Sequence, residues 1–286
     1  MSRVVRKVLR RRRQSRGVQQ ENTSLQSAQE RYRQRLIAPV APPECPPGCD
    51  IGPPTFVGVG VQKAGTAWWY HHLISHPGVA GTVRKELHYF EHGWEREFDD
   101  QAVAWYHRYF PRPPGIVTGE WTPRYMLDPW TPPRLRTAAP DAKLLVLLRD
   151  PVARLQSGLR HHMTLTPDPL HPRFVIEAIE RGRYATQLTH LLKHFPRQQI
   201  LVLQLELCGQ EPEREMARTY EFLGLDPHFV PDDLHRPIHP GRGEPISLPD
   251  DLERFAFETY RPDIEQLARD WPEIDLELWP TAKKAT

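Results

Sequence analysis

Short apolar runs alternate with amphipathic stretches over most of this chain. The apolar runs show little polar alternation, which is typical of strands buried on both faces of a parallel sheet. Stretches with helical spacing lie between them and after the last one. The predicted strands are Thr55–Val61, Ile116–Gly119, Lys143–Leu148 and Gln199–Leu205, and the predicted helices are Ala67–Ser75, Val103–Tyr109, Pro151–Met163, Phe174–Glu180, Ala185–His194, Glu211–Leu223, Leu248–Tyr260 and Asp263–Asp270.

This alternation of strands and helices predicts an α/β fold of three layers, with a central parallel sheet flanked by helices. Ligands of such sheets bind beyond the carboxyl ends of the strands. The loops after Val61 and after Leu148 are therefore the expected places for chemistry.

Two segments precede this pattern. Residues 1–38 are polar and charged, and they predict a flexible basic arm. Residues 39–54 are rich in proline, which fits neither a regular helix nor a central strand, and they predict a linker. The folded domain is predicted for residues 55–286.

Charge is distributed unevenly along the chain, although the net charge is only +2. Eight of the 38 basic residues and no acidic residue lie in residues 1–16, which leaves 30 basic residues against 36 acidic ones in the rest. A basic arm of this kind is able to contact nucleic-acid phosphates, so a non-enzymatic nucleic-acid-binding module is one alternative. We favour a solvated tail and do not expect nucleic acid as a partner.

The three cysteines, Cys45, Cys49 and Cys208, do not make a disulfide framework, which suits a reducing compartment. Whether Cys45 and Cys49 pair stays open. No apolar run approaches the roughly 18 residues that cross a bilayer, and the first residues lack the apolar segment of a secretory signal. We therefore predict a cytoplasmic protein without a membrane span.

A glycine loop follows the first predicted strand. Gln62-Lys63-Ala64-Gly65-Thr66 stands between strand and helix, where backbone N–H groups bind phosphate. With Gly60 it supplies the two glycines of a Walker A loop, but no lysine follows Gly65. The loop predicts a P-loop-like fold that holds a phosphate. A nucleotide-dependent phosphotransferase such as a kinase is the second alternative.

Two more clusters point to chemistry. Arg149 ends the third predicted strand, and Ser157 lies about two turns into the helix that follows, which suits a second phosphate site. Lys85, Glu86 and His88 form a tight group of titratable side chains, which suits a general base. A phosphate loop followed by a candidate base suggests group transfer from a nucleotide.

Four segments in this order resemble the sulfotransferases that use 3′-phosphoadenosine 5′-phosphosulfate (PAPS), and the heparan-sulfate-like branch in particular. Gln62–Thr66 is similar to the 5′-phosphosulfate loop of that family, Lys85–Phe90 to the K-E-x-H-F-F stretch that carries its catalytic base, Gly119–Tyr125 to its G-E-x-[ST]-P-x-Y segment, and Arg149 through Ser157 and His161 to its 3′-phosphate motif.

The resemblance implies PAPS as cofactor, 3′,5′-adenosine bisphosphate as product, and no metal. Glu86 is then the expected base and Lys63 the cation that neutralises charge on the leaving phosphate. His88 is the alternative base, and Glu86 alternatively only pairs with a neighbouring cation. The implied nucleotide-binding residues are Gln62, Lys63, Ala64, Gly65, Thr66, Ala67, Trp68, Arg149, Ser157 and Arg242, and the implied substrate-binding residues are Lys85 and Tyr125.

The chain departs from the family pattern at several points. Ala67 stands where the family usually has a second Thr, and Leu159 replaces an aromatic residue. The cysteine pair of the secreted animal enzymes has no counterpart, which again suits a reducing compartment. The acceptor is expected to be a hydroxyl or amine of a glycan, a lipid or a small metabolite, and the acidic body of the chain favours a neutral one.

Overall fold

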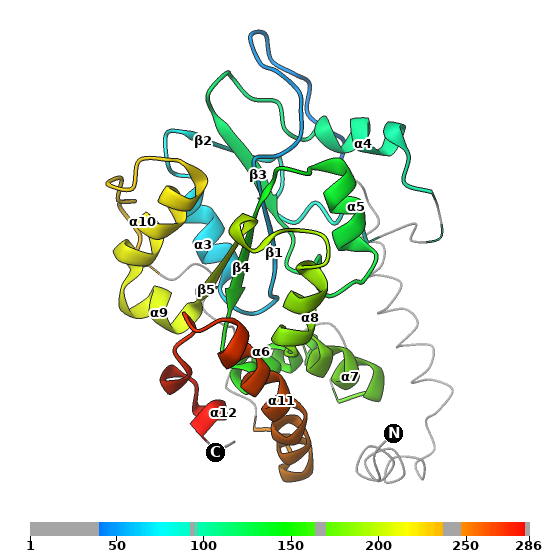
Figure 1. Cartoon of the computed structure of the whole chain (residues 1–286), viewed down its shortest axis with the longest axis vertical. Helices are drawn as coiled ribbons and strands as arrows, with labels where there is room; N and C mark the ends of the chain where they lie inside the picture. Colours follow the sequence, from blue (N-terminus) through cyan, green and yellow to red (C-terminus); the bar gives the residue numbers. More distant parts are fainter. Residues whose placement is uncertain (1–39, 92–94, 96, 164–169, 237–246, 284–286) are drawn as a thin grey trace. The chain divides into compact units, whose positions relative to one another are not determined.

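A computed structural model of the chain describes residues 40–91, 95, 97–163, 170–236 and 247–283 (Figure 1). The predicted basic arm, residues 1–38, lies outside these ranges. The described chain divides into two compact units. We call residues 40–149 and 185–236 the sheet unit, and residues 150–184 and 247–283 the helical unit.

The sheet unit is built on five parallel strands in the order β2-β3-β1-β4-β5. They are β1 (Phe56–Gly60), β2 (Val79–Gly81), β3 (Val117–Trp121), β4 (Lys143–Leu148) and β5 (Ile200–Gln204). Every residue of β1 and β5 is buried, which explains why these runs lack polar alternation. The prediction of an α/β fold with a central parallel sheet is confirmed, and β2 adds one short strand at its edge.

Helices flank this sheet on two sides (Figure 1). On one side lie α3 (Thr66–Leu73), α9 (Leu205–Gln210) and α10 (Pro212–Leu223), and on the other α4 (Asp100–His107), α5 (Thr131–Ala138) and α8 (Tyr184–Leu191). On the first side, the Trp69 indole N–H donates to Thr219 Oγ1 (3.2 Å) and the Tyr220 hydroxyl donates to the His72 carbonyl (3.1 Å). These bonds fix α3, which begins at the glycine loop, against α10.

The chain enters the helical unit at Asp150. This unit contains α6 (Pro151–Met163), α7 (Pro172–Glu180), α11 (Asp250–Asp270), α12 (Pro280–Lys283) and a 3₁₀ turn at Leu276–Leu278. The Asp150 carboxylate accepts the backbone N–H of Ala153 at the start of α6 and both the N–H and hydroxyl of Thr281 in α12. One buried side chain therefore caps one helix and ties another to it.

The two late helices that the sequence predicts are one helix in the structure. α11 continues through Pro262, so the expected break at residues 261–262 is wrong. A proline inside a helix removes one backbone hydrogen bond, and packing compensates for that loss where the helix has a buried face. Here Tyr260, Ile264 and Leu267 form such a face around the proline.

The described part of the proline-rich segment packs on the rest of the sheet unit. Asp50 and Arg112 exchange two backbone hydrogen bonds (2.9 and 3.0 Å), and the Tyr109 hydroxyl donates to the Val40 carbonyl (2.6 Å). Cys45 and Cys49 in this segment are both free thiols. Residues 40–54 are thus held at two points rather than only connecting other parts.

In the part of the chain that the structure describes, no helix is both long enough and apolar enough to cross a membrane.

Candidate active site

Four segments that carry candidate site residues follow four neighbouring strands of the sheet. The glycine loop follows β1, Arg149 follows β4, the Lys85–Glu91 segment follows β2, and Thr122–Tyr125 follows β3. Because all strands are parallel, these segments leave the sheet at the same edge. Topology thus gathers the predicted site residues of the sheet unit, although they are far apart in sequence.

The glycine loop turns sharply into α3. Gly65 has a φ of 83° and Lys63 a φ of 71°, the left-handed region that turns the chain from strand to helix. The first intrahelical bond runs from the Trp69 N–H to the Gly65 carbonyl (3.1 Å), so the N–H groups of Thr66, Ala67 and Trp68 have no backbone acceptor within α3. This arrangement fits a phosphate at the helix start.

Close packing holds the loop in place. An added Cβ at Gly65 would lie 2.6 Å from Leu205 Cδ1, and one at Gly58 would lie 2.1 Å from the Trp121 ring. The Trp121 indole also donates to the Gly60 carbonyl (3.1 Å). The strand that leads into the loop therefore needs glycine because a fully buried tryptophan lies against it.

Arg149 joins the second predicted anion site to the loop. Its Nη1 donates to the Lys63 carbonyl at 3.2 Å, so the ends of β1 and β4 are linked directly. Ser157 is buried on α6, in the helical unit, and Arg242 lies outside the described residues. The indole N–H of Trp68 is engaged by the Leu234 carbonyl (3.0 Å).

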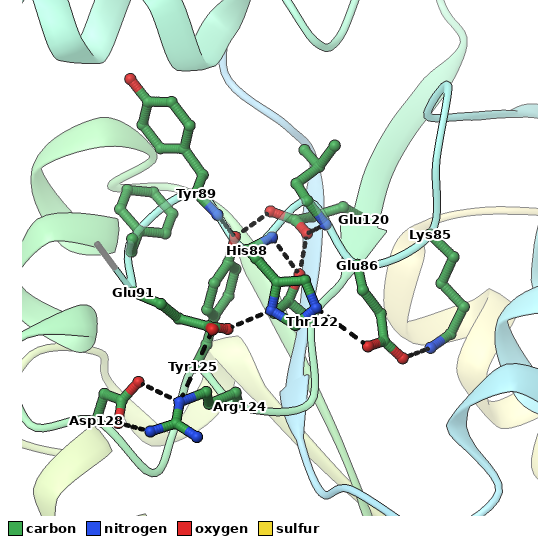
Figure 2. Close-up of polar contacts among 12 residues, drawn as sticks. Lys85, Glu86, His88, Tyr89, Glu91, Glu120, Thr122, Arg124, Tyr125 and Asp128 are labelled. Carbon is green, nitrogen blue, oxygen red and sulfur yellow. Dashed lines mark hydrogen bonds and ion pairs between the residues drawn. The ribbon is translucent and has the colours of Figure 1, made fainter. Parts of the chain in front are cut away.

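The candidate base lies in a compact ionic cluster (Figure 2). Glu86 accepts from Lys85 Nζ (2.8 Å) through one oxygen and faces His88 Nε2 (3.3 Å) through the other. The Glu86 side chain is 39% exposed, so it remains open to solvent. The structure thus brings together the three titratable side chains that the sequence predicts as a group.

Electrostatics in this cluster favours the charged forms. Burial by itself raises the pKa of Glu86, but hydrogen bonds and charge from His88 and Lys85 outweigh it and lower that pKa to about 2. Burial lowers the pKa of His88, but hydrogen bonds and charge from Glu86 and Glu91 outweigh it and raise that pKa to about 9. At neutral pH Glu86 is a carboxylate and His88 an imidazolium, which favours Glu86 over His88 as the proton acceptor.

The ionic cluster continues inward through residues that the sequence did not predict as site residues. His88 Nδ1 lies 2.6 Å from Glu91 Oε1, and Glu91 Oε2 lies 3.8 Å from Arg124 Nε. Arg124 in turn donates to both carboxylate oxygens of Asp128 (2.8 and 3.2 Å). From Asp128 to Glu86 the charges alternate in sign (Figure 2). Glu91, three residues after His88, was the one available signal for this extension.

A buried carboxylate, Glu120, was also missed as a site residue. It is fully buried at the end of β3 and accepts from the hydroxyls of Tyr106 (3.0 Å), Thr122 (2.6 Å) and Tyr125 (2.9 Å). Burial raises the pKa of Glu120, although these hydrogen bonds act in the opposite direction. A charged residue in an otherwise buried strand was the signal for it.

Tyr125, predicted to bind substrate, is fully buried. Its hydroxyl lies between Glu120 and the Tyr89 N–H (2.9 Å). Its contact with a substrate stays a prediction that this geometry does not favour.

Comparison with known proteins identifies the family. The sulfotransferase domain matches residues 53–239 of this chain. Human heparan sulfate glucosamine 3-O-sulfotransferase 3B1 is 33% identical over 195 residues, covering 62% of this chain and 48% of that protein. The membrane-associated sulfotransferase kil1 of Dictyostelium discoideum is 30% identical over 166 residues, covering 57% of this chain and 31% of that protein. The chain spans about half the length, or less, of these curated relatives.

The fold leads to the same family. The crystal structure of a sulfotransferase from Alicyclobacillus acidocaldarius matches 80% of this chain and 99% of its own, with 26% identity and a TM-score of 0.65.

These relatives also correct one prediction. The expected cytoplasmic location is contradicted, because one relative, kil1, is by its name a membrane-associated sulfotransferase. Few cysteines and the lack of an apolar run are negative signals, and neither determines a compartment. The resemblance of the four motifs to PAPS-dependent sulfotransferases of the heparan-sulfate-like branch is confirmed, and the chain belongs to the sulfotransferase family.

Proposed function

We propose that this protein transfers a sulfuryl group from PAPS to a hydroxyl or amine of a glycan. The observation that carries the proposal is the hydrogen bond from Arg149 to the Lys63 carbonyl (3.2 Å). It joins the two predicted anion-binding segments at the ends of neighbouring strands. A nucleotide with phosphates at its 3′ and 5′ positions requires two such segments side by side.

The residues of the glycine loop suit the 5′ end of that nucleotide. The N–H groups of Thr66, Ala67 and Trp68 would hold the phosphate at the start of α3, where the helix dipole favours negative charge. The Thr66 hydroxyl would add a donor. Arg149 would hold the 3′-phosphate. Ser157 and Arg242, which belong to the helical unit and to the residues outside the described ranges, stay predicted nucleotide-binding residues. Bound PAPS supplies a sulfuryl group activated by a phosphate leaving group.

Lys63 and Glu86 are the proposed catalytic residues. Lys63 would neutralise the charge that develops on the leaving phosphate. Glu86 would take the acceptor proton, and it is present as the carboxylate because Lys85 and His88 lower its pKa to about 2. Such a weak base suffices when proton transfer follows bond formation, since the acceptor O–H becomes strongly acidic as its oxygen bonds to sulfur. Lys85 would also contact the acceptor.

The relatives support a glycan as the acceptor. By name, the human relative acts on glucosamine of heparan sulfate. Outside residues 1–16 this chain has 30 basic and 36 acidic residues, so its body lacks the excess positive charge that attracts a polyanion. We therefore propose a glycan of low charge rather than a highly sulfated one.

Calorimetry with 3′,5′-adenosine bisphosphate tests the nucleotide site. We expect the wild-type protein to bind it, and Lys63→Ala and Arg149→Ala to weaken binding by about tenfold or more, because each removes a charged partner of a phosphate. Lys193→Ala, at an exposed position of the sheet unit, is the control and should bind normally. A wild-type protein that does not bind the nucleotide would overturn the proposal.

A transfer assay with PAPS then tests the acceptor. A panel of desulfated and sulfated glycans is incubated with protein and PAPS, and the mass gain of one sulfo group is measured for each. We expect the desulfated glycans to react faster. Transfer only to lipids or small metabolites would reject the glycan while leaving the nucleotide site intact.

A further inference from the structure

The backbone around the candidate base has an unusual conformation. Glu86 and His88 have φ values of 67° and 55°, in the left-handed region that residues other than glycine rarely adopt. Such conformations persist only where the surroundings hold them, and they occur preferentially at functional sites. The two residues are also the ones whose side chains face each other in the ionic cluster.

Three successive backbone N–H groups in this segment donate to side chains of one other segment (Figure 2). The Leu87 N–H donates to Glu120 Oε2 (3.3 Å), the His88 N–H to Thr122 Oγ1 (3.3 Å), and the Tyr89 N–H to the Tyr125 hydroxyl (2.9 Å). None of these bonds belongs to a helix or strand. Side chains at the end of β3 and just after it therefore accept the hydrogen bonds that secondary structure would otherwise provide for this backbone.

The direction of these bonds follows from the hydroxyl groups. Thr122 donates its hydrogen to Glu120 Oε2 (2.6 Å), and Tyr125 donates its hydrogen to Glu120 Oε1 (2.9 Å). A hydroxyl has one hydrogen, so each oxygen is left to accept the backbone N–H. All three N–H groups are thus connected to the Glu120 carboxylate. The Leu87 N–H bonds to it directly, the His88 N–H through the Thr122 hydroxyl, and the Tyr89 N–H through the Tyr125 hydroxyl.

We propose that Glu120, acting through Thr122 and Tyr125, is a positioning residue for the candidate base Glu86 and its partner His88. This inference rests on the proposed function. A carboxylate is needed at residue 120 because it only accepts, and it accepts four donors here. Each carboxylate oxygen accepts one bridging hydroxyl and one other donor, so an amide nitrogen at either position would face the hydroxyl of Thr122 or Tyr125 with a hydrogen instead of a lone pair and would remove that bond.

Thr122→Val tests the proposal with little change of shape. It removes the hydroxyl between His88 and Glu120. We expect kcat to fall by about 10²-fold, the scale of a small misplacement of a catalytic group. The KM for PAPS and the stoichiometry of 3′,5′-adenosine bisphosphate binding should stay as in the wild-type protein. Thr122→Ser restores the hydroxyl and should recover most of kcat.

Thr131→Val is the matched control. Thr131 is fully buried in the same unit, and its hydroxyl has no hydrogen-bond partner among the described residues. We expect this variant to keep the wild-type kcat. The pair separates the loss of one particular hydrogen bond from the general effect of placing valine at a buried threonine.

Two results would overturn the proposal. Thr122→Val with wild-type kcat would overturn the proposal, and so would a fall in kcat matched by an equal fall in nucleotide-binding stoichiometry, because that reports loss of folded protein. If Thr122→Val does not fold, Tyr125→Phe, which removes only the other bridging hydroxyl, is judged by the same two readouts. Failure of the proposed function looks different, since the wild-type protein itself would then bind no nucleotide and transfer no sulfuryl group.

Discussion

Glu86 and His88 stabilise each other's charged forms. These charge states determine which of the two side chains is able to accept a proton. Glu86 carries its negative charge because Lys85 and His88 surround it, whereas His88 already holds its proton between two carboxylates. The sequence identified Glu86 as the base through the resemblance to the sulfotransferases, and His88 as the alternative because an imidazole in the same cluster is also able to take a proton. It did not rank them by charge state, because that depends on Glu91, whose position relative to the imidazole follows from the turn of the backbone.

Replacing Glu86 with Gln should abolish turnover while leaving the nucleotide site intact. The amide keeps the shape but does not accept a proton, and a general base contributes roughly 10²–10⁴-fold to rate. The measurement is kcat with PAPS and a reactive acceptor, together with the affinity for 3′,5′-adenosine bisphosphate. Near-normal turnover in Glu86→Gln would remove Glu86 from this role.

His88 should make stability depend on pH. Its pKa is about 9 in the folded protein and about 6.5 in an unfolded chain, so its contribution is full below pH 6.5 and is lost as pH rises through about 9. The free energy of unfolding of the wild-type protein, minus that of His88→Gln, should therefore decrease over this range. Urea unfolding at a series of pH values measures it.

A wild-type advantage over His88→Gln that grows with pH would contradict the raised pKa. The lowered pKa of Glu86 acts at the other end, since its contribution is present above pH 4.5 and is lost as pH falls toward about 2.

At the scale of elements, the sequence predicted the strands better than the smaller helices. β4 and α6 have the bounds that the pattern indicates, because a continuous apolar run and a long amphipathic stretch leave little ambiguity. β2 is only three residues long and carries no pattern of its own. α5 begins Thr131-Pro132-Pro133, which suggests a break, yet proline is well suited to the first turn of a helix.

Asp150 provides a test at this scale. Asp150→Ala removes the cap of α6 and both bonds to Thr281, so the free energy of unfolding should fall by about 3 kcal/mol. Chemical denaturation of both proteins measures the difference. Asp141→Ala, at an exposed turn, is the control and should change stability by less than about 0.5 kcal/mol. An equally small change in Asp150→Ala would show that the two helices are held by other contacts.

For the whole molecule, the fold and the family could be predicted from the sequence, and the location could not. Four motifs in order are specific because each follows a strand of one parallel sheet, so spacing and topology constrain one another. The cellular location has no such relation to motif spacing or to sheet topology. The Glu120 network was equally beyond the sequence, because it unites residues from β3, α4 and the segment after β2.

Truncation tests the domain organisation. We propose that residues 1–38 are an arm outside the folded domain, so a chain of residues 40–286 should unfold at the same temperature as the full chain. A chain of residues 55–286 also loses the Tyr109–Val40 bond and both Asp50–Arg112 bonds, and should be less stable by about 3 kcal/mol. Thermal and urea unfolding of the three chains measure this. Equal stability of the two truncated chains would show that residues 40–54 contribute nothing.

The three hydrogen bonds at residues 87–89 have a consequence for deuterium exchange. These residues lie outside helices and strands, where amide hydrogens normally exchange quickly. Here each amide hydrogen is occupied by Glu120, Thr122 or Tyr125 in the sheet unit. The segment should therefore exchange as slowly as the strands of the sheet, and Thr122→Val should speed exchange at His88 first. A loop beside the candidate base would then appear, in a mass-spectrometric exchange map, as part of the protected core.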